Sequence, residues 1–424
     1  MIRPLHFLHL LILLALSIGP ASAQVTTGTP PFGSFGGGPD VINLANLNSH
    51  IAIPVLHKPG RGTNFTYDLS YDSSVWYPVG VSGSQTWQYV NNWGWRGQTE
   101  VATGYITYSV TKTSCLVDPG PPRQTDIKTR YYNWTYHDPF GVPHNMNIAV
   151  YDDATCLNQS DPYSQTSTVG DGSGYTMTAD ASPSATITSA SGKIINAPLL
   201  SSAGAGIATD RNGNKISVST GGIFTDTLGM TALTVTGGAP NPLVFTYTAP
   251  SGANASYAMK YSSYTVQTAF GCSGITEYGA NGTTTASLVS EIDLPDISVN
   301  PNDKYTFGYE ITPNDTHNPH YVTGRLVSIT LPTGGTITYT YNNGNITGGA
   351  ASNGIVCADG TTAGLQRVLS DGAGWSSTWN YARALGTAPA STIIITDPER
   401  DTLAPNGNDT VISFQGIYEV QRQT

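Results

Sequence analysis

Two segments in the C-terminal half of the chain repeat one order of apolar, turn and aromatic residues, and they begin 38 residues apart, at Leu288 and Leu326. Each copy runs from an apolar strand through a Leu-Pro pair to a return segment with alternating aromatic residues: Leu294-Pro295 and Tyr305-Thr306-Phe307, then Leu331-Pro332 and Tyr339-Thr340-Tyr341. A weaker third copy begins at Val368-Leu369-Ser370 and continues to Trp375, Trp379 and Tyr381. Self-similarity at a fixed period is typical of folds that stack one small unit.

The second copy has the pattern of a β-hairpin. Val327, Ile329 and Leu331 alternate with other residues on one strand, and Gly334 can adopt the positive φ of a turn. An isolated hairpin is not stable in water, so such units must stack on neighbours. We therefore expect the core of the repeats to contain these side chains: Tyr305, Phe307, Tyr309, Ile337, Tyr339 and Tyr341.

The rest of the chain has the composition of an all-β protein. Charged residues make up 11% of it, whereas soluble proteins have about 25%, and we find no long window with the spacing of an amphipathic helix. Short runs of Thr, Val, Ile and Tyr are separated instead by Gly, Asn, Asp and Pro. The sequence predicts an all-β fold, with a β-sandwich-like N-terminal region followed by stacked antiparallel β-hairpins.

The first residues have the pattern of an export signal. Arg3 precedes the uncharged apolar run Leu8–Leu16, and Ala21-Ser22-Ala23 supplies the small residues of a cleavage site. The apolar run is shorter than the roughly 20 residues that span a bilayer. We expect a signal peptide over residues 1–23 and an exported protein, secreted or at the cell surface, with no transmembrane segment after cleavage.

Shifts in composition divide the mature chain. A Gly/Pro-rich lead-in covers residues 24–40, and an N-terminal β domain covers residues 41–180. A Ser/Ala/Gly-rich segment over residues 181–208 has the composition of a linker. A second β region follows over residues 209–285, and the hairpin repeats occupy residues 286–424.

The four cysteines, Cys115, Cys156, Cys272 and Cys357, indicate two disulfides in an oxidising compartment, with three pairings possible. We favour Cys115–Cys156 and Cys272–Cys357, on the ground that a bridge should stay within one domain. In the loop-entropy account each bridge contributes roughly 4 kcal/mol to stability. The spacing fits no zinc motif, and free buried cysteines are the alternative.

The segment Tyr321-Val322-Thr323-Gly324-Arg325-Leu326 and the return strand from Gly335 to Tyr341 resemble the repeat of the RHS (YD-repeat) family. That repeat opens with roughly Tyr-Asp-x-x-Gly-Arg-Leu, then has a glycine turn and a strand with Tyr-x-Tyr. Val322 stands here in place of the aspartate. The resemblance is specific over about residues 286–345.

Weaker features of the same style occur elsewhere. Asp-x-x-Gly turns begin at Asp138, Asp210 and Asp226, and the stretch from Pro31 to Val55 is similar to the start of long exported members. The resemblance implies a spiralling sheet of hairpins that forms a shell around a C-terminal passenger, often a toxin. The Asp-Pro-x-Gly-Leu cleavage motif that precedes the passenger is not found, because Val142 follows Asp138-Pro139-Phe140-Gly141, which we interpret as an ordinary turn.

Charge and motifs restrict the possible functions. The formal charge of −10 and the absence of a Lys/Arg cluster argue against a nucleic-acid partner. No nucleophile elbow, phosphate loop or zinc-protease motif is present, so we assign no catalytic residue and no cofactor.

Two short segments resemble metal sites but have simpler explanations. Asp210-Arg211-Asn212-Gly213-Asn214 offers oxygen ligands at alternate positions, as calcium loops do, yet fits a plain hairpin turn equally well. His317 and His320 have no evident third ligand and fit a solvated loop. We therefore predict no metal site.

The aromatic cluster between Trp76 and Trp95 leaves a choice of functions. Trp87, Trp93 and Trp95 could stack on sugar rings, although buried packing of a β-sandwich also explains them. Our main hypothesis is a non-enzymatic structural or interaction protein, the exported N-terminal part of an RHS-type surface or toxin-carrier shell, with a passenger, surface protein or glycan as partner. The alternatives are a stand-alone adhesin or carbohydrate-binding module, and a secreted hydrolase.

Overall fold

The structure, a computed structural model, describes residues 35–37, 40–59, 64–98, 103–138, 142–157, 161–200, 205–280, 284–345, 353–387, 390–398, 409–416 and 418–424. Within these residues the regular structure consists of strands and one short 3-10 helix, η1 (Asn91–Gly94), so the prediction of an all-β fold is confirmed. No helix among them is long and apolar enough to cross a membrane. The predicted signal peptide and most of the lead-in lie outside the described residues.

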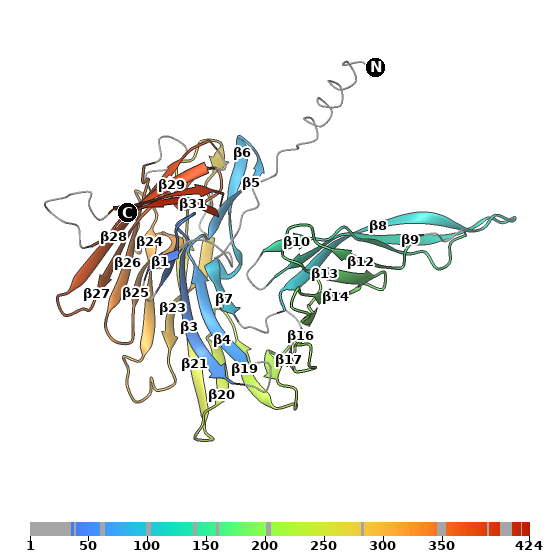
Figure 1. Cartoon of the computed structure of the whole chain (residues 1–424), viewed down its shortest axis with the longest axis horizontal. Helices are drawn as coiled ribbons and strands as arrows, with labels where there is room; N and C mark the ends of the chain where they lie inside the picture. The colour runs from blue at the N-terminus through green and yellow to red at the C-terminus, as the bar shows by residue number, and fades with distance from the viewer. Residues whose placement is uncertain are drawn as a thin grey trace, which may run out of the picture.

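One sheet of 19 strands dominates the molecule, and we call it the large sheet. Its spatial order is its sequence order, and each strand pairs antiparallel with the next. Figure 1 shows its second half curving around the blue strands of the N-terminal region. Its strands are β12 (Ser164–Thr168), β13 (Thr176–Asp180), β14 (Ser184–Thr188), β15 (Ile194–Asn196), β16 (Gly206–Thr209), β17 (Lys215–Val218), β18 (Ile223–Thr225), β19 (Thr231–Gly237), β20 (Leu243–Thr248), β21 (Asn254–Val266), β23 (Thr284–Asp293), β24 (Lys304–Ile311), β25 (Val322–Thr330), β26 (Thr336–Asn342), β27 (Gly364–Ser370), β28 (Ser376–Leu385), β29 (Ala390–Thr396), β30 (Asp409–Gln415) and β31 (Tyr418–Gln423).

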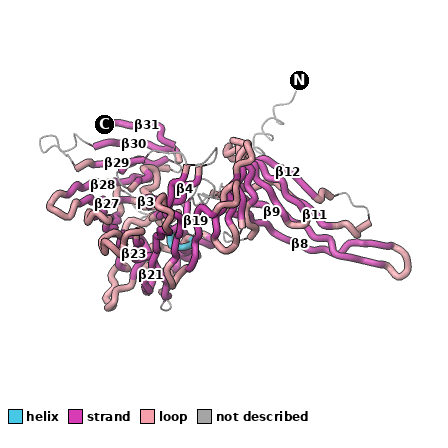
Figure 2. Tube along the Cα trace, turned by 90° about the horizontal axis from the view of Figure 1, so that it is seen from below, coloured by secondary structure: helices cyan, strands magenta, loops and turns pink. Residues whose placement is uncertain are grey.

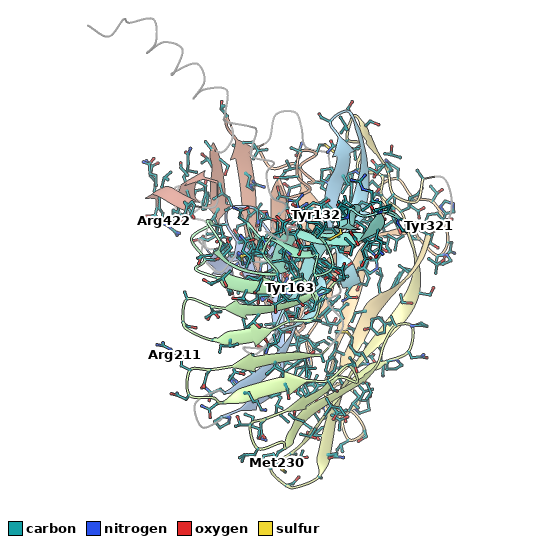
Figure 3. The ribbon with its side chains drawn as sticks, turned by 90° about the vertical axis from the view of Figure 1, so that its right-hand side faces the viewer. Tyr132, Tyr163, Arg211, Met230, Tyr321 and Arg422 are labelled. Carbon is teal, nitrogen blue, oxygen red and sulfur yellow. A yellow bond between two sulfur atoms is a disulfide. The ribbon has the colours of Figure 1, made fainter. Side chains whose placement is uncertain are left out.

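Many of its hairpins close with the same five-residue turn. In residues 210–214 the side chain of Asp210 accepts the backbone N–H of Asn214 at 2.9 Å, and Gly213 has a φ of +82°. Residues 226–230 repeat this arrangement, with Asp226 accepting from Met230 at 2.9 Å. Glycine is required at the fourth position because other residues rarely adopt a positive φ. Figure 3 shows Arg211 and Met230, one from each turn, at the rim of the sheet.

The hairpin of β25 and β26 has the predicted alternation. Ile337, Tyr339 and Tyr341 are buried on β26, whereas Thr338 and Thr340 between them are exposed. The backbone N–H of Leu331 donates to the carbonyl oxygen of Gly335 and closes the turn, and Gly334 has a φ of +87°. Phe307 and Tyr309 are buried as predicted, and Tyr305 near the start of β24 is half-buried.

A five-stranded sheet from the N-terminal region lies against the large sheet, and we call it the inner sheet. In spatial order it consists of β1 (Phe35–Gly37), β2 (Val41–Asn43), β3 (Ser49–Lys58), β4 (Phe65–Asp72) and β7 (Trp95–Gln98). Its buried side chains and those of the large sheet from β16 onward form one hydrophobic core. Ring contacts across this core include Tyr67 with Phe245, whose centroids are 5.6 Å apart, and Trp95 with Phe307 at 4.9 Å.

A second unit projects to one side as an arm (Figures 1 and 2). It is built on the long hairpin of β8 (Tyr105–Asp118) and β9 (Gln124–His137), with β10 (Pro143–Asn145) and β11 (Ala149–Asp152) beside β9. Its base packs on β13 and β14 through a separate core that includes Trp134 and Met177. The disulfide Cys115–Cys156 ties β8 to the segment after β11.

A small three-stranded sheet lies beside the inner sheet. It contains β5 (Trp76–Val81), β6 (Ser84–Tyr89) and β22 (Ile275–Thr276). The disulfide Cys272–Cys357 fixes the segment before β22 to the loop before β27. The favoured cysteine pairing is confirmed, but this second bridge crosses the boundary predicted at residue 285.

The predicted regions correspond only partly to these sheets. Residues 41–180 supply strands to the inner sheet, the small sheet, the arm and the first strands of the large sheet. The inner sheet therefore packs against strands from residues 209–424 and not against a second sheet formed by residues 41–180. The predicted linker, residues 181–208, contributes β14 and β15 and the start of β16 to the large sheet. Ile187 on β14 and Ile195 on β15 are cross-strand partners and both are buried, which explains why this Ser/Ala-rich segment forms strands.

Candidate functional site

Residues 321–326 form several polar contacts between the N-terminal region and the large sheet. Trp76 donates its indole N–H to the carbonyl oxygen of Thr323 at 2.8 Å. The backbone N–H of Leu326 donates to the hydroxyl of Tyr71 at 3.0 Å. The hydroxyl of Tyr341 donates to the carbonyl oxygen of Leu326 at 2.8 Å, so both backbone groups of Leu326 are bound by tyrosines. Residues 321–326 are thus one place where the N-terminal region is attached to the large sheet.

Gly324, inside this segment, is a position of close approach. Its φ is +82°, and a Cβ added there would lie 2.8 Å from the Trp93 ring. The glycine of the repeat therefore permits both the backbone conformation and the contact with a ring from the N-terminal region.

Arg325 lies in the same segment and pairs within the large sheet, from β25 to β24. Its guanidinium donates from Nε to Glu310 at 2.8 Å and from Nη2 to the other carboxylate oxygen at 2.7 Å. It also lies 4.0 Å from the ring centroid of Tyr341 and donates to the carbonyl of Asn353. Bidentate pairing satisfies a buried guanidinium, whose desolvation would otherwise be costly.

A second buried cluster joins the first described strands to the hairpins. Asp40 accepts hydrogen bonds from Arg367 Nε at 2.8 and 2.9 Å and from the Tyr339 hydroxyl at 2.6 Å. Burial and the neighbouring Asp40 carboxylate raise the pKa of Tyr339 well above its usual value, so its hydroxyl stays a donor. The hydrogen bond to Asp40 raises the pKa of Arg367 despite the opposing effect of burial.

The tyrosines of this contact surface are structural donors. Burial raises the pKa of Tyr67 to about 12, and it raises the pKa values of Tyr71, Tyr309 and Tyr341 further. The Tyr309 hydroxyl donates to the carbonyl oxygen of Val289 at 2.7 Å. These phenols therefore keep their protons over the physiological range and are unsuited to proton transfer.

A cavity of about 590 Å³ opens where the edge of the inner sheet meets the large sheet. Its floor consists of buried side chains from β4, β7, β20, β21 and β23: Tyr67, Trp95, Phe245, Met259, Leu288 and Val289. Its walls include the rings of Tyr89, Trp93, Tyr261 and Tyr278. Asn91, Asn92, Thr285 and Ser287 supply polar groups at its rim.

The tryptophans suggested for glycan stacking are placed differently from one another. Trp87 is 1% exposed and meets Phe270 edge to face at 5.5 Å, away from the cavity. Trp93 and Trp95 line the cavity but are themselves buried. Buried packing thus accounts for all three rings. The exposed ring is Tyr89, which composition alone does not distinguish from the other tyrosines.

The suggested metal segments are occupied by internal hydrogen bonds. Asp210 accepts from the backbone of its own turn, as a hairpin turn requires. His317 and His320 both contact Asp315, at 2.6 and 3.1 Å, and both rings are more than half exposed. Among the described residues no group of three or more His, Cys, Asp or Glu side chains is arranged to hold a metal ion.

A histidine that belongs to no sequence motif lies at the base of the arm. His144 on β10 is buried, with Nδ1 2.6 Å from Asp171 and Nε2 3.4 Å from Asp138. The partners lie 27 and 6 residues away along the chain, so no local motif identifies the cluster. Its groups connect β10 to the turn between β12 and β13.

Comparison with known proteins identifies no relative. No family model matches the chain, no curated protein is similar to it, and no solved structure resembles it.

Proposed function

We propose that the chain is the exported N-terminal part of an RHS-type shell, a scaffold that encloses or presents another protein segment and has no catalytic role. The observation that carries this proposal is the large sheet itself. Its 19 strands are added one after another in sequence order, and it curves around a sheet from the N-terminal region. A sheet that grows by successive hairpins can be lengthened without changing its existing core, which suits a shell.

The contacts of the repeat segment support the same proposal. Thr323, Gly324 and Leu326 contact the N-terminal region, and Arg325 between them pairs with Glu310 of the large sheet. In this proposal the motif is used to hold the interior of the shell. The two disulfides and the leader sequence favour an oxidising location outside the cytoplasm.

The test of this proposal uses the gene and the exported protein as the native cell produces them. The gene and transcript are read past the codon for Thr424, and the exported protein is isolated with an antibody against residues 205–280 for peptide mass spectrometry. We expect further Tyr-rich hairpins, and peptides of a passenger that purifies with them. A stop codon with no such repeats, together with a protein isolated alone, would contradict the shell.

A further inference from the structure

We propose that the cavity between the inner sheet and the large sheet binds a short, neutral oligosaccharide, with Tyr89 as the stacking ring. Its volume of about 590 Å³ lies within the range of about 300–1,000 Å³ for small-molecule sites. This inference is independent of the shell function, since it depends only on the residues around the cavity.

The stacking surface is fixed in advance of any ligand. Tyr89 is 37% exposed, and its ring lies parallel to that of Trp93, with centroids 4.1 Å apart and planes at 4°. Tyr278 meets Tyr89 edge to face at 5.5 Å. A ring held from behind and from the side loses little freedom when a sugar face lies on it, so the cost of ordering is small.

The backbone beneath this surface has an uncommon conformation. Asn92 and Trp93 have φ values of +54° and +55°, in the left-handed region. That conformation is rare for a bulky side chain such as Trp93, and residues held in it cluster at ligand sites. Here it places Trp93 behind Tyr89 and turns Asn92 outward, where it is exposed at the rim.

The polar groups indicate which ligand fits. Asn91, Asn92, Thr285 and Ser287 offer both donors and acceptors, as the hydroxyls of a sugar need. Arg96 is the charged residue among the described residues that line the cavity, and its guanidinium already lies 2.5 Å from Asp72. An anionic or cationic ligand would find no uncompensated opposite charge. An aromatic wall with a neutral polar rim therefore favours a neutral sugar.

The test uses the full mature chain and isothermal titration calorimetry. The probes are neutral tetrasaccharides of β-glucose, α-glucose, mannose and N-acetylglucosamine, with tetragalacturonate as an anionic comparison and an uncharged Ser/Tyr peptide as a non-sugar comparison. We expect saturable binding of at least one neutral tetrasaccharide. Binding should weaken about tenfold in Tyr89→Ala, the effect of losing one good aromatic contact.

Two further variants keep the test decisive. Asn92→Gly removes an amide at a position whose positive φ glycine tolerates, so the fold is retained while affinity falls. Trp375→Ala removes an exposed ring outside the cavity and should leave binding unchanged.

The proposal is overturned if no neutral tetrasaccharide binds, if only the anionic sugar or the peptide binds, or if Tyr89→Ala and Asn92→Gly bind as the parent chain does. Because these titrations do not involve a passenger, their failure leaves the shell proposal standing, and the reverse also holds.

Discussion

Arg367 and Asp40 form a buried ion pair between residues 327 positions apart in the sequence. The side chain of Arg367 is 1% exposed and that of Asp40 is 0% exposed. Tyr339 donates to the same carboxylate, so the three groups satisfy one another inside the interface. Asp40, just before β2, is thus bound to β27 in the third copy of the repeat.

Removing one partner should therefore destabilise the whole core. Asp40→Ala leaves the Arg367 guanidinium buried without its counter-charge, and we expect the free energy of unfolding to fall by about 3–5 kcal/mol. Urea denaturation followed by tryptophan fluorescence measures this. The double variant Asp40→Leu/Arg367→Met should recover most of the loss, because two apolar side chains leave no charge unpaired.

An exposed ion pair supplies the control. Arg422 and Glu419 pair at 2.8 Å on β31, where Arg422 is 46% exposed. Glu419→Ala should change stability by at most about 1 kcal/mol. If Asp40→Leu/Arg367→Met were as unstable as Asp40→Ala, the unpaired charge of Arg367 would not be the source of the lost stability.

Tyr339 tests the burial of the repeat tyrosines. Its ring is 3% exposed, so Tyr339→Ala should cost about 3–5 kcal/mol, and Tyr339→Phe about 2 kcal/mol for the charged hydrogen bond alone. Thr338→Ala and Thr340→Ala, on the exposed face of the same strand, should change stability by no more than about 0.5 kcal/mol. Equal melting curves for Tyr339→Ala and Thr340→Ala would refute the inward orientation of the ring.

A comparison of alanine variants at Gly324 and Gly213 distinguishes a glycine in close contact with a ring from an ordinary turn glycine. Gly324 and Gly213 share a φ of +82°, but a Cβ at Gly324 meets the Trp93 ring at 2.8 Å whereas nothing lies within 4 Å at Gly213. Alanine at either position should cost about 1–2 kcal/mol for the left-handed conformation. Gly324→Ala should cost about 1–3 kcal/mol more for the forced displacement of packed atoms. Similar losses at the two sites in thermal melts would argue against close contact between residue 324 and Trp93.

The sequence predicted those features that depend on neighbouring residues. Period-2 alternation placed Ile337, Tyr339 and Tyr341 on the buried face because side chains alternate across a strand whatever lies opposite. The partners that cover this face, Asp40 and Tyr71, could not be predicted, since nothing in a single sequence encodes a contact across roughly 250–330 residues. Residues 181–208 form strands for a related reason, since burial in a long sheet overrides a Ser/Ala-rich composition.

The cavity shows the same limit at the level of single side chains. Trp87 and Tyr89 lie on the same face of β6, two residues apart, yet their exposed fractions are 1% and 37%. Trp87 lies under Phe270, while Tyr89 ends the strand beside the cavity. Aromatic content therefore indicated the region, and the packing of distant elements decided which ring is accessible.

The base of the arm should respond to pH through His144. Burial alone would lower the pKa of His144, but hydrogen bonds to Asp138 and Asp171 outweigh it and raise the pKa above 6.5. A raised pKa in the folded state means that the contribution to stability is complete below pH 6.5 and is lost as the pH rises through the folded value. Burial alone would raise the pKa of Asp171, yet hydrogen bonds from Ser173 and His144 lower it below 3.8. That contribution is present above pH 3.8 and is lost in acid.

The cluster should accordingly be most stable between about pH 4 and pH 6.5. Hydrogen exchange of the backbone amides of β10, β12 and β13 measures this local stability. After correction for the intrinsic pH dependence of exchange, we expect the exchange rates to increase between pH 6 and pH 9. His144→Gln should remove the contribution of His144 to this pH dependence.

His137 is a second titrating group nearby. Burial lowers the pKa of His137, so its effect on stability is opposite to that of His144. It is present in both proteins, so the difference between the two profiles isolates His144. Identical profiles for the parent chain and His144→Gln would show that the imidazole does not join β10 to the Asp171 turn.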